Sequence, residues 1–210
     1  MAKYPIYLDL SGRRVVVVGA GMVAARKVCA LAEAGARVVV VAEHIDPVFE
    51  ESCRQPHIEL IESGYSRDYL AGAILCIAAT NDNAVNRRIY GDCQQLGVLC
   101  NVVDVPELCD FHVPAVVRRG PLQIAIGTEG NCPAYAGHLR RRLEEMFTED
   151  HGRFVEALET ARKRIIKTVS DPNKRKSLLG SLVTDESLEY FISSGHEAWL
   201  RRAEAMAQGQ

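Results

Sequence analysis

Two glycines and an alanine follow four valines in the stretch VVVVGAGMVAA. Gly19 lies where the strand must end, Gly21 has no Cβ that would block a phosphate, and Ala24 lets a helix pack closely on a strand. A helix over Met22–Ala34, closed by Gly35, would present its N-terminal amides to an anion. The pattern favours a dinucleotide pyrophosphate, but such a turn also occurs as a tight corner in a buried sheet.

An acidic residue follows the second apolar run. Glu43 comes 24 residues after Gly19, near the position at which dinucleotide-binding sheets place the acid that accepts the ribose hydroxyls. No arginine adjoins Glu43 to receive a 2′-phosphate. The sequence therefore favours NAD over NADP, with strand, spacing, helix and acid all in agreement.

Polar residues also end the later apolar runs. Thr80 and Asn81 follow one run, and Asn101 and Asp104 close the next. Ligands of parallel sheets bind at the carboxyl ends of the strands, so Asp104 would lie over the nicotinamide end of the crevice. A turn or helix cap is the other use of an aspartate before Val-Pro-Glu, and the spacing alone does not decide between the two.

Composition limits the classes of function. The chain has 210 residues, 48% of them apolar, and a formal net charge of −2, which excludes a polycation built to bind nucleic acid. No run approaches the ~20 apolar residues of a membrane span, and no secretory segment opens the chain, so we expect a cytoplasmic protein. Seven cysteines without a C-x-x-C motif predict reduced thiols rather than disulfides or a zinc site.

The elements that must position these residues form two patterns. Up to residue 113, short apolar runs alternate with helical patterns, which predicts an α/β fold with a Rossmann-type parallel sheet. Residues 114–148 predict a dimerisation hairpin, turning at Arg118–Pro121, and a helix. Residues 149–210 predict a helical carboxyl-terminal domain. The strands are expected at Val15–Val18, Val38–Val41, Ile58–Ile61, Ile74–Ala79 and Val98–Val103.

The helical part has an internal break and a concentration of positive charge. Asp171-Pro172-Asn173 should end one helix, and DESLEYFISSGHEAWLRRAEAMA should form another helical segment. Residues 162–176 hold seven basic residues and one acid, without interleaved aromatics. This composition indicates a solvated helical face or a cationic wall for an anionic ligand, not a nucleic-acid site.

At this point the chain resembles a known family over most of its first 147 residues. The blocks YPIYLDLSGRRVVVVGAGMVAARKV, IAATNDNAVNRRI and NVVDVPELCDFHVPAVVRRGPLQIAIGTEGNCPAYAGHLRRRLE are similar to the precorrin-2 dehydrogenase and sirohydrochlorin ferrochelatase family, the amino-terminal module of siroheme synthases. The resemblance implies NAD-dependent oxidation of precorrin-2 to sirohydrochlorin. In some members it also implies insertion of a ferrous or cobalt ion. We expect a homodimer for a separate reason, because the antiparallel strands and apolar helix faces need to be shielded.

The resemblance assigns roles to individual residues. The family aspartate in NVVD matches Asp104, which implies a catalytic role and transient contact with the metal. His112 is the nearest candidate to assist Asp104 with the metal, although a histidine on an apolar run is more often simply packed. The expected cofactor-binding residues are Gly19, Ala20, Gly21, Met22, Val23, Glu43, His44, Thr80 and Asn81.

The substrate carries eight carboxylates, so its pocket should be rimmed with cations. Each candidate arginine could equally be a solvated surface charge. The stretch 127–133 departs from the family pattern, because Gly127, Glu129 and Cys132 replace its usual residues and Glu129 adds negative charge. The expected substrate-binding residues are Asn101, Arg118, Arg119, Thr128 and Arg140, with Arg141 and Arg142 as further candidates.

Two other functions fit parts of the sequence. A regulatory module that senses NAD without turnover would explain the glycine-rich turn and the helices, but not the NVVD block or the arginines. A chelatase without dehydrogenase activity would bind the tetrapyrrole and not NAD. Turnover of precorrin-2 with NAD separates these alternatives.

Overall fold

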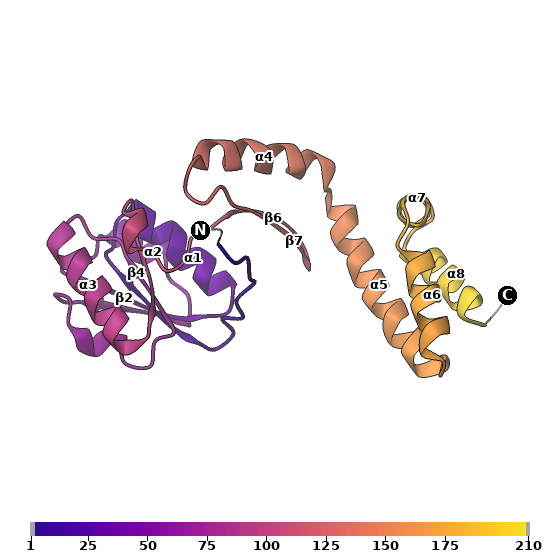
Figure 1. Ribbon diagram of the computed structural model, residues 1–210, viewed down its shortest axis with the longest axis horizontal. Coiled ribbons are helices and arrows are strands. Elements are labelled where there is room, and N and C mark those ends of the chain that lie inside the picture. The colour runs from indigo at the N-terminus through magenta and orange to yellow at the C-terminus, as the bar shows by residue number, and fades with distance from the viewer. Residues whose placement is uncertain (1–2, 209–210) are drawn as a thin grey trace. The chain divides into compact units, whose positions relative to one another are not determined.

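The computed structural model describes residues 3–208, which form two compact units, one up to Val113 and one from Pro114 onward (Figure 1). The first unit is a five-stranded sheet in the order β3-β2-β1-β4-β5, and every neighbouring pair is parallel. This confirms the predicted Rossmann-type fold. The strands are β1 (Arg14–Val18), β2 (Arg37–Ala42), β3 (Ile58–Glu62), β4 (Leu75–Ala78) and β5 (Leu99–Val102).

Helices cover both faces of this sheet. Val15 and Val17 of β1 pack on one face with Ala24 and Val28 of α1, while Val16 and Val18 pack on the other face with residues of α3. Successive side chains of a strand point to opposite faces, so a strand covered on both sides needs a continuous apolar run. The helical elements are α1 (Met22–Glu33), α2 (Pro47–Ser52), α3 (Asn83–Leu96) and the 3₁₀ helices η1 (Arg67–Leu70) and η2 (Pro106–Leu108).

The strand order reverses between β1 and β4. From β1 the chain proceeds through β2 to β3 on one side, then crosses to β4 and β5 on the other. At such a reversal the connections leave the carboxyl ends of two adjacent strands in opposite directions, which opens a crevice there. The residues that follow β1, β4 and β5 are therefore the ones that the fold brings to one edge.

The second unit begins with a tight hairpin. Strands β6 (Ala115–Arg119) and β7 (Leu122–Ile126) pair antiparallel, with Arg119 opposite Leu122. Only Gly120 and Pro121 are left for the turn, and Gly120 has φ +52°, a left-handed conformation that glycine adopts readily. The prediction of a turn over Arg118–Pro121 was therefore wrong by two residues, since both arginines belong to β6.

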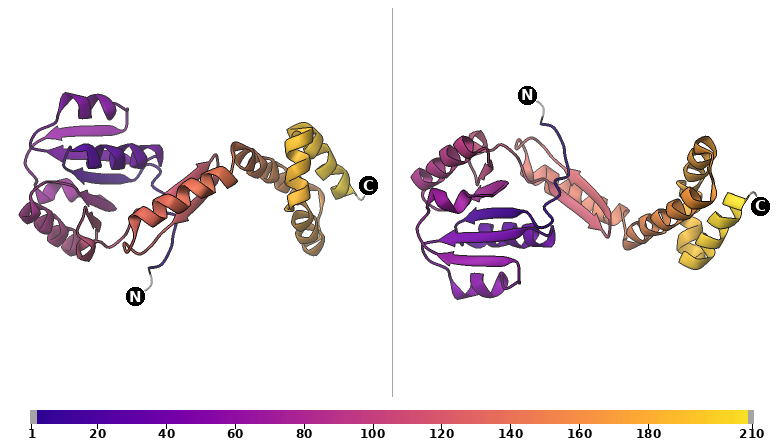
Figure 2. Two further views of the ribbon diagram at one scale, coloured as in Figure 1. Left: turned by 90° about the horizontal axis from the view of Figure 1, so that it is seen from above. Right: turned by 90° about the horizontal axis from the view of Figure 1, so that it is seen from below.

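Five helices follow the hairpin, and α4 lies along it (Figure 2). The core of the helical part contains Phe154, Phe191 and Trp199, whose rings contact one another. The predicted last helical segment is two helices, because Gly195, with φ +83°, interrupts it. The helices are α4 (Pro133–Met146), α5 (Glu149–Thr168), α6 (Pro172–Leu182), α7 (Asp185–Ser194) and α8 (His196–Gln208).

Helix α5 also packs on the hairpin, within the compact unit that begins at Pro114. A Cβ on Gly152 would lie 2.4 Å from the carbonyl oxygen of Arg119, which shows how closely α5 and β6 approach. The predicted further boundary at residue 148 stays a prediction. Among residues 3–208, no helix combines the length and the apolar character that crossing a membrane requires.

Candidate functional site

The turn after β1 is shaped by its first glycine. Gly19 has φ +114°, and its amide donates a hydrogen bond of 2.8 Å to the carbonyl of Val41. A Cβ at this position would lie 2.4 Å from the carbonyl oxygen of Ala79, directly after β4. No side chain fits there without moving the backbone. Gly19 therefore brings the ends of β1 and β4 together at the crevice.

The second glycine leaves an open space. Gly21 is the N-cap of α1, and a Cβ built on it would meet nothing within 4 Å. No side chain caps this helix, and its first turn contains no acidic residue, so its N-terminal amides are available to an anion. Met22 is 88% exposed and Val23 37% exposed beside them. A dinucleotide pyrophosphate fits this arrangement, with Ala20 completing the turn.

The acid predicted to bind the ribose follows β2 directly. Glu43 is exposed, and among residues 3–208 its carboxylate has no hydrogen bond or ion pair. It is therefore available to accept hydrogen bonds from ribose hydroxyls. The next residue, His44, is held differently: its Nδ1 lies 3.2 Å from Oε1 of Glu62 on β3. The cofactor roles of both residues stay predictions.

The loop after β4 is fixed by a buried asparagine that the sequence analysis did not identify. The hydroxyl of Thr80 donates to Oδ1 of Asn86 at 2.8 Å, and Nδ2 of Asn86 donates to the carbonyl of Thr80 at 3.0 Å. Asn86 is only 3% exposed. Asp82 caps α3 by accepting from the amide of Ala84 at 2.7 Å. Because the Thr80 hydroxyl is engaged in the fold, the exposed Asn81 has the freer side chain at this edge.

Asp104 lies two residues beyond β5 in an unusual backbone conformation. Its φ is +61°, in the left-handed region that non-glycine residues seldom occupy. Residues held in this way often occur at functional sites. The following helix η2 has Val105 at its N-cap and no side-chain cap, so Asp104 does not cap it. Among residues 3–208, the exposed carboxylate has no hydrogen bond or ion pair.

Asn101 does not face the crevice as a substrate-binding residue would. Asn101 is only 7% exposed. Its Nδ2 donates hydrogen bonds to the carbonyl of Phe111 at 2.8 Å and to Sγ of Cys109 at 3.4 Å. An isolated bridge between Asn101 and Cys109 brings the returning chain alongside β5. Asn101 therefore ties the 103–111 segment to the sheet, and its placement does not favour the predicted contact with substrate.

Two of the candidate arginines have partners within the second unit. Nε of Arg119 donates to the carbonyl of Phe147 at 2.7 Å, and one terminal nitrogen donates to that of Glu144 at 3.0 Å, which satisfies the end of α4. Arg140 pairs with the Glu144 side chain one turn along the same helix. Arg118 is exposed on β6, as are Arg141 and Arg142 on α4. Arg119 therefore has a structural role in the second unit, and its predicted contact with the substrate stays a prediction.

The stretch that departs from the family pattern forms a structured turn. Oγ1 of Thr128 accepts from the amide of Cys132 at 3.3 Å, and its carbonyl accepts from Asn131 at 2.8 Å. Glu129 has φ +52° and is exposed. Thr128 thus organises the entry to α4, and its contact with substrate stays a prediction.

Three of the seven basic residues in the run 162–176 are engaged with neighbouring groups. Nζ of Lys163 lies 2.7 Å from Oε1 of Glu159, and Arg164 pairs with Glu204 of α8. A terminal nitrogen of Arg175 donates to a backbone carbonyl at 3.3 Å. These contacts favour the solvated helical face over the cationic wall.

All seven cysteines are free, and Cys132 is the exposed one among them. Within residues 3–208, no three His, Cys, Asp or Glu side chains are grouped to hold a metal ion. His112 is half-buried beside Phe111. A transient metal contact would therefore depend on Asp104, as the resemblance implies.

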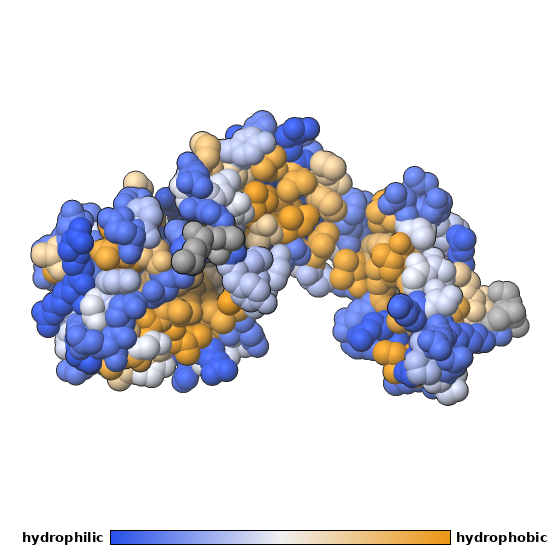
Figure 3. All heavy atoms as spheres, in the orientation of Figure 1, coloured by the Kyte–Doolittle hydropathy of each residue, from blue (hydrophilic) through white to orange (hydrophobic). Residues whose placement is uncertain are grey.

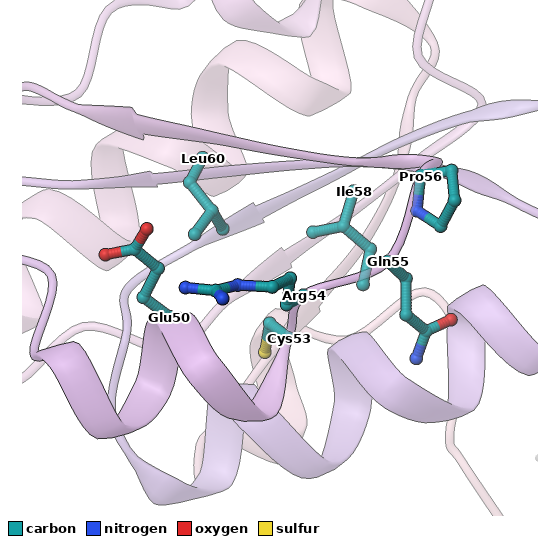
Figure 4. A pocket seen from close by; sticks show the side chains of 7 residues that line it. All are labelled: Glu50, Cys53, Arg54, Gln55, Pro56, Ile58 and Leu60. Carbon is teal, nitrogen blue, oxygen red and sulfur yellow. The ribbon is translucent and has the colours of Figure 1, made fainter.

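A cavity of about 580 Å³ lies elsewhere in the first unit, between α2 and the edge strand β3 (Figure 4). Apolar side chains of Ile58 and Leu60 line it, with one cation, Arg54, and one carboxylate, Glu50. None of the predicted site residues contributes to its wall. We therefore place the candidate site at the carboxyl ends of β1, β4 and β5 and not in this cavity.

Two family models match the chain one after the other. The model described as "Putative NAD(P)-binding" matches residues 6–115, slightly more than half of the chain. The chain belongs to this NAD(P)-binding family. A second model, described as "Sirohaem biosynthesis protein central", matches residues 119–146, which include β7, α4 and the end of β6.

Curated relatives of this NAD(P)-binding chain have the name siroheme synthase. The protein from Azotobacter vinelandii is 34% identical over 209 residues, which is 100% of this chain and 45% of the relative. That from Methylobacillus flagellatus is 35% identical over 198 residues, or 94% of this chain and 42% of the relative. The chain thus spans less than half the length of these relatives.

A solved structure shares the fold of the whole chain. The structure titled "SirC, precorrin-2 dehydrogenase" superposes with a TM-score of 0.79 at 24% identity, covering 96% of this chain and 99% of that chain. The order of a parallel sheet, a hairpin and a helical region is therefore a known architecture.

Asn86 and the half-buried Lys27 on α1 are the two residues at this site that the sequence analysis missed. Asn86 could have been suspected from Thr-Asn-Asp-Asn-x-x-Asn, whereas nothing in the sequence marks Lys27 as buried.

Proposed function

We propose that this chain oxidises precorrin-2 to sirohydrochlorin with NAD as the oxidant. The observation that carries the proposal is the succession of two matches, to an NAD(P)-binding family and then to a sirohaem biosynthesis region, in relatives named siroheme synthase. A Rossmann-type fold alone would not suffice, because it hosts many unrelated functions. The shared fold with a precorrin-2 dehydrogenase supports the proposal.

The reaction removes a hydride and a proton from precorrin-2 and yields sirohydrochlorin, NADH and H⁺. Bound NAD supplies the hydride acceptor. Asp104 accepts the proton, since it is a carboxylate near the carboxyl end of β5 that no other described side chain engages by hydrogen bond or ion pair. Gly19, Gly21 and the first turn of α1 hold the pyrophosphate, and Glu43 accepts the ribose hydroxyls and disfavours the 2′-phosphate of NADP.

The substrate-binding residues are proposed from charge. Arg118 and Arg140, together with Thr128, are the candidates for the substrate carboxylates, and Arg141 and Arg142 are exposed on the same helix as Arg140. Insertion of a ferrous or cobalt ion into the product would use Asp104 at the same site. We place the reaction in the cytoplasm.

The active form is proposed to be a homodimer through the second unit. Strands β6 and β7 form a sheet of two strands whose outer edges are unpaired within the described chain. Apolar atoms gather where β6, β7 and α4 lie (Figure 3), and Tyr135 and Met146 of α4 are 54% and 63% exposed. Unpaired edges beside apolar surface favour pairing with a second copy. Sedimentation at micromolar concentration should show a dimer, and a monomer would refute this part.

The decisive experiment supplies precorrin-2 and NAD and follows NADH formation, then adds ferrous iron to the product. We expect turnover by the parent and a fall of on the order of a hundredfold or more in Asp104→Asn, which keeps the shape but cannot accept a proton. Thermal stability and NAD affinity should stay close to those of the parent, because the carboxylate is exposed.

The outcomes separate the alternatives. NAD binding without turnover would indicate a sensing module, and tetrapyrrole binding with iron insertion but without NAD binding would indicate a chelatase alone. If Asp104→Asn oxidises precorrin-2 at the parent rate, the assignment of the proton to Asp104 is wrong.

A further inference from the structure

Lys27 is a cation held against the body of the first unit. It lies on α1 next to Val28, which is fully buried in the core, and its own side chain is half-buried. Val103 and Phe111, on either side of η2, pack against the same core cluster as Val28. The fold thus brings this part of α1 and the segment after β5 together.

Two electrostatic neighbours of Lys27 lie on that segment. Burial and repulsion from Arg26 lower the pKa of the Lys27 ammonium, and attraction to Cys109 and Asp104 partly opposes this effect. Cys109 is fixed in place, because its Sγ lies 3.2 Å from the carbonyl of Val102 and 3.3 Å from that of Val105. Lys27 is therefore within electrostatic range of the segment that carries Asp104 and Cys109.

None of these neighbours neutralises the ammonium. Burial raises the pKa of the Cys109 thiol, so the thiol is uncharged near neutral pH. Within residues 3–208, Lys27 has no ion pair and no hydrogen bond, and Asp104 has none either. A partly desolvated cation without a partner is costly to the folded chain. Such a cation beside an open crevice is suited to an anionic ligand that completes its contacts.

We propose that Lys27 is a positioning residue that holds one carboxylate of the tetrapyrrole substrate beside Asp104. This inference rests on the proposed function, since it assumes a polycarboxylate substrate at this crevice. The pyrophosphate is assigned to the first turn of α1 at Met22 and Val23, whereas the neighbours of Lys27 follow β5. Pairing with the substrate would place its reacting carbon against the carboxylate that takes the proton.

The test compares three variants of the full chain. Lys27→Met keeps the apolar stem and removes the charge, Lys27→Arg restores a cation, and Arg26→Met makes the same charge change at an exposed neighbour on α1. Binding of uroporphyrin I, a stable porphyrin with eight carboxylates, is followed by fluorescence. NAD binding is followed by calorimetry, and precorrin-2 oxidation by steady-state kinetics.

We expect Lys27→Met to weaken uroporphyrin binding by about tenfold to a hundredfold, the effect of losing one charged hydrogen bond. The KM for precorrin-2 should rise by a similar factor with kcat changed much less. Lys27→Arg should recover most of the loss, and Arg26→Met should behave as the parent. The affinity for NAD should be unchanged in all three.

Three results would overturn the inference: equal uroporphyrin affinity in Lys27→Met and the parent, no uroporphyrin binding by the parent, or loss of NAD affinity in place of tetrapyrrole affinity. If Lys27→Met does not fold, Lys27→Arg is compared with the uncharged variant Lys27→Gln. Equal uroporphyrin affinity of these two variants would also overturn the inference. Failure of the proposed function is distinguishable. In that case the parent does not oxidise precorrin-2, while the uroporphyrin titration still reports on Lys27.

Discussion

The two glycines of the turn after β1 should respond in opposite ways to substitution. At Gly21 a Cβ meets nothing within 4 Å, so Gly21→Leu is accommodated by the protein and costs about 1 kcal/mol as a poor N-cap. The same side chain occupies the space in which the pyrophosphate would meet the amides of α1. Losing two charge-assisted hydrogen bonds, at about 1.5–3 kcal/mol each, weakens NAD binding by at least about a hundredfold.

At Gly19 a substitution should lower the free energy of unfolding. Gly19→Ala must adopt φ +114° and place its Cβ 2.4 Å from the Ala79 carbonyl oxygen. Backbone strain of about 1–3 kcal/mol and overpacking of about 1–3 kcal/mol add to about 2–6 kcal/mol. At about 4–8 °C for each kcal/mol in a unit of this size, the melting temperature should fall by at least about 8 °C.

Calorimetric titration with NAD and thermal melts of both variants test this reasoning together. Gly21→Leu should melt about 4–8 °C below the parent, a smaller fall than that of Gly19→Ala, and bind NAD at least about a hundredfold more weakly. If it binds NAD with the parent affinity, the turn is only a structural corner and the cofactor site lies elsewhere. If Gly19→Ala melts with the parent, the close approach of β1 and β4 does not constrain this position.

Three further predictions concern residues around the two units. Glu43→Ala should weaken NAD binding about tenfold and reduce the preference for NAD over NADP, because the ribose loses its hydrogen-bond acceptor. Titration with each nucleotide measures both effects, and an unchanged ratio of the two affinities would refute the role of the carboxylate. Asn86→Ala should lower the free energy of unfolding, measured by denaturant titration, by about 2–3 kcal/mol because it leaves buried polar groups unpaired. The control is Asn83→Ala, at the exposed start of the same helix, which should lower it by under about 0.5 kcal/mol. Arg119→Met should destabilise the second unit by about 2 kcal/mol, since the last turn of α4 loses its donors. Arg142→Met on the exposed face of α4 is its control, and equal melting of the two variants would contradict the structural role of Arg119.

The sheet was predictable from the sequence because its strands are buried on both faces. Val15–Val18 alternate between two cores, so an unbroken apolar run was the only pattern compatible with the position of β1. The glycine-rich turn and Glu43 were predictable for a related reason, since they follow such strands directly. For these features the local sequence predicts both the strand and the residue at which the strand ends.

Other features depend on contacts between distant segments. Asn101 lies within β5, and its side chain is buried because Cys109 and Phe111 return alongside this strand. The predicted turn of the hairpin was two residues too long, because Gly120 and Pro121 alone complete the turn. The attraction of Lys27 to Asp104 and Cys109 likewise joins segments that lie more than seventy residues apart in the chain.

The cofactor site of this fold is thus determined more by backbone than by side chains. Gly19 sets the separation of β1 from β4, and Asn86 fixes the loop that follows β4 by bonding to Thr80. The side chains of Met22 and Val23 extend into solvent, and changing them leaves both backbone walls in place. Substitutions at these two positions should therefore alter affinity in small steps, whereas a change at Gly19 or Asn86 alters the crevice itself. The charged groups at this crevice that have no hydrogen bond or ion pair among residues 3–208 include Glu43, Asp104 and Lys27, and under the proposed function the last two act on the substrate.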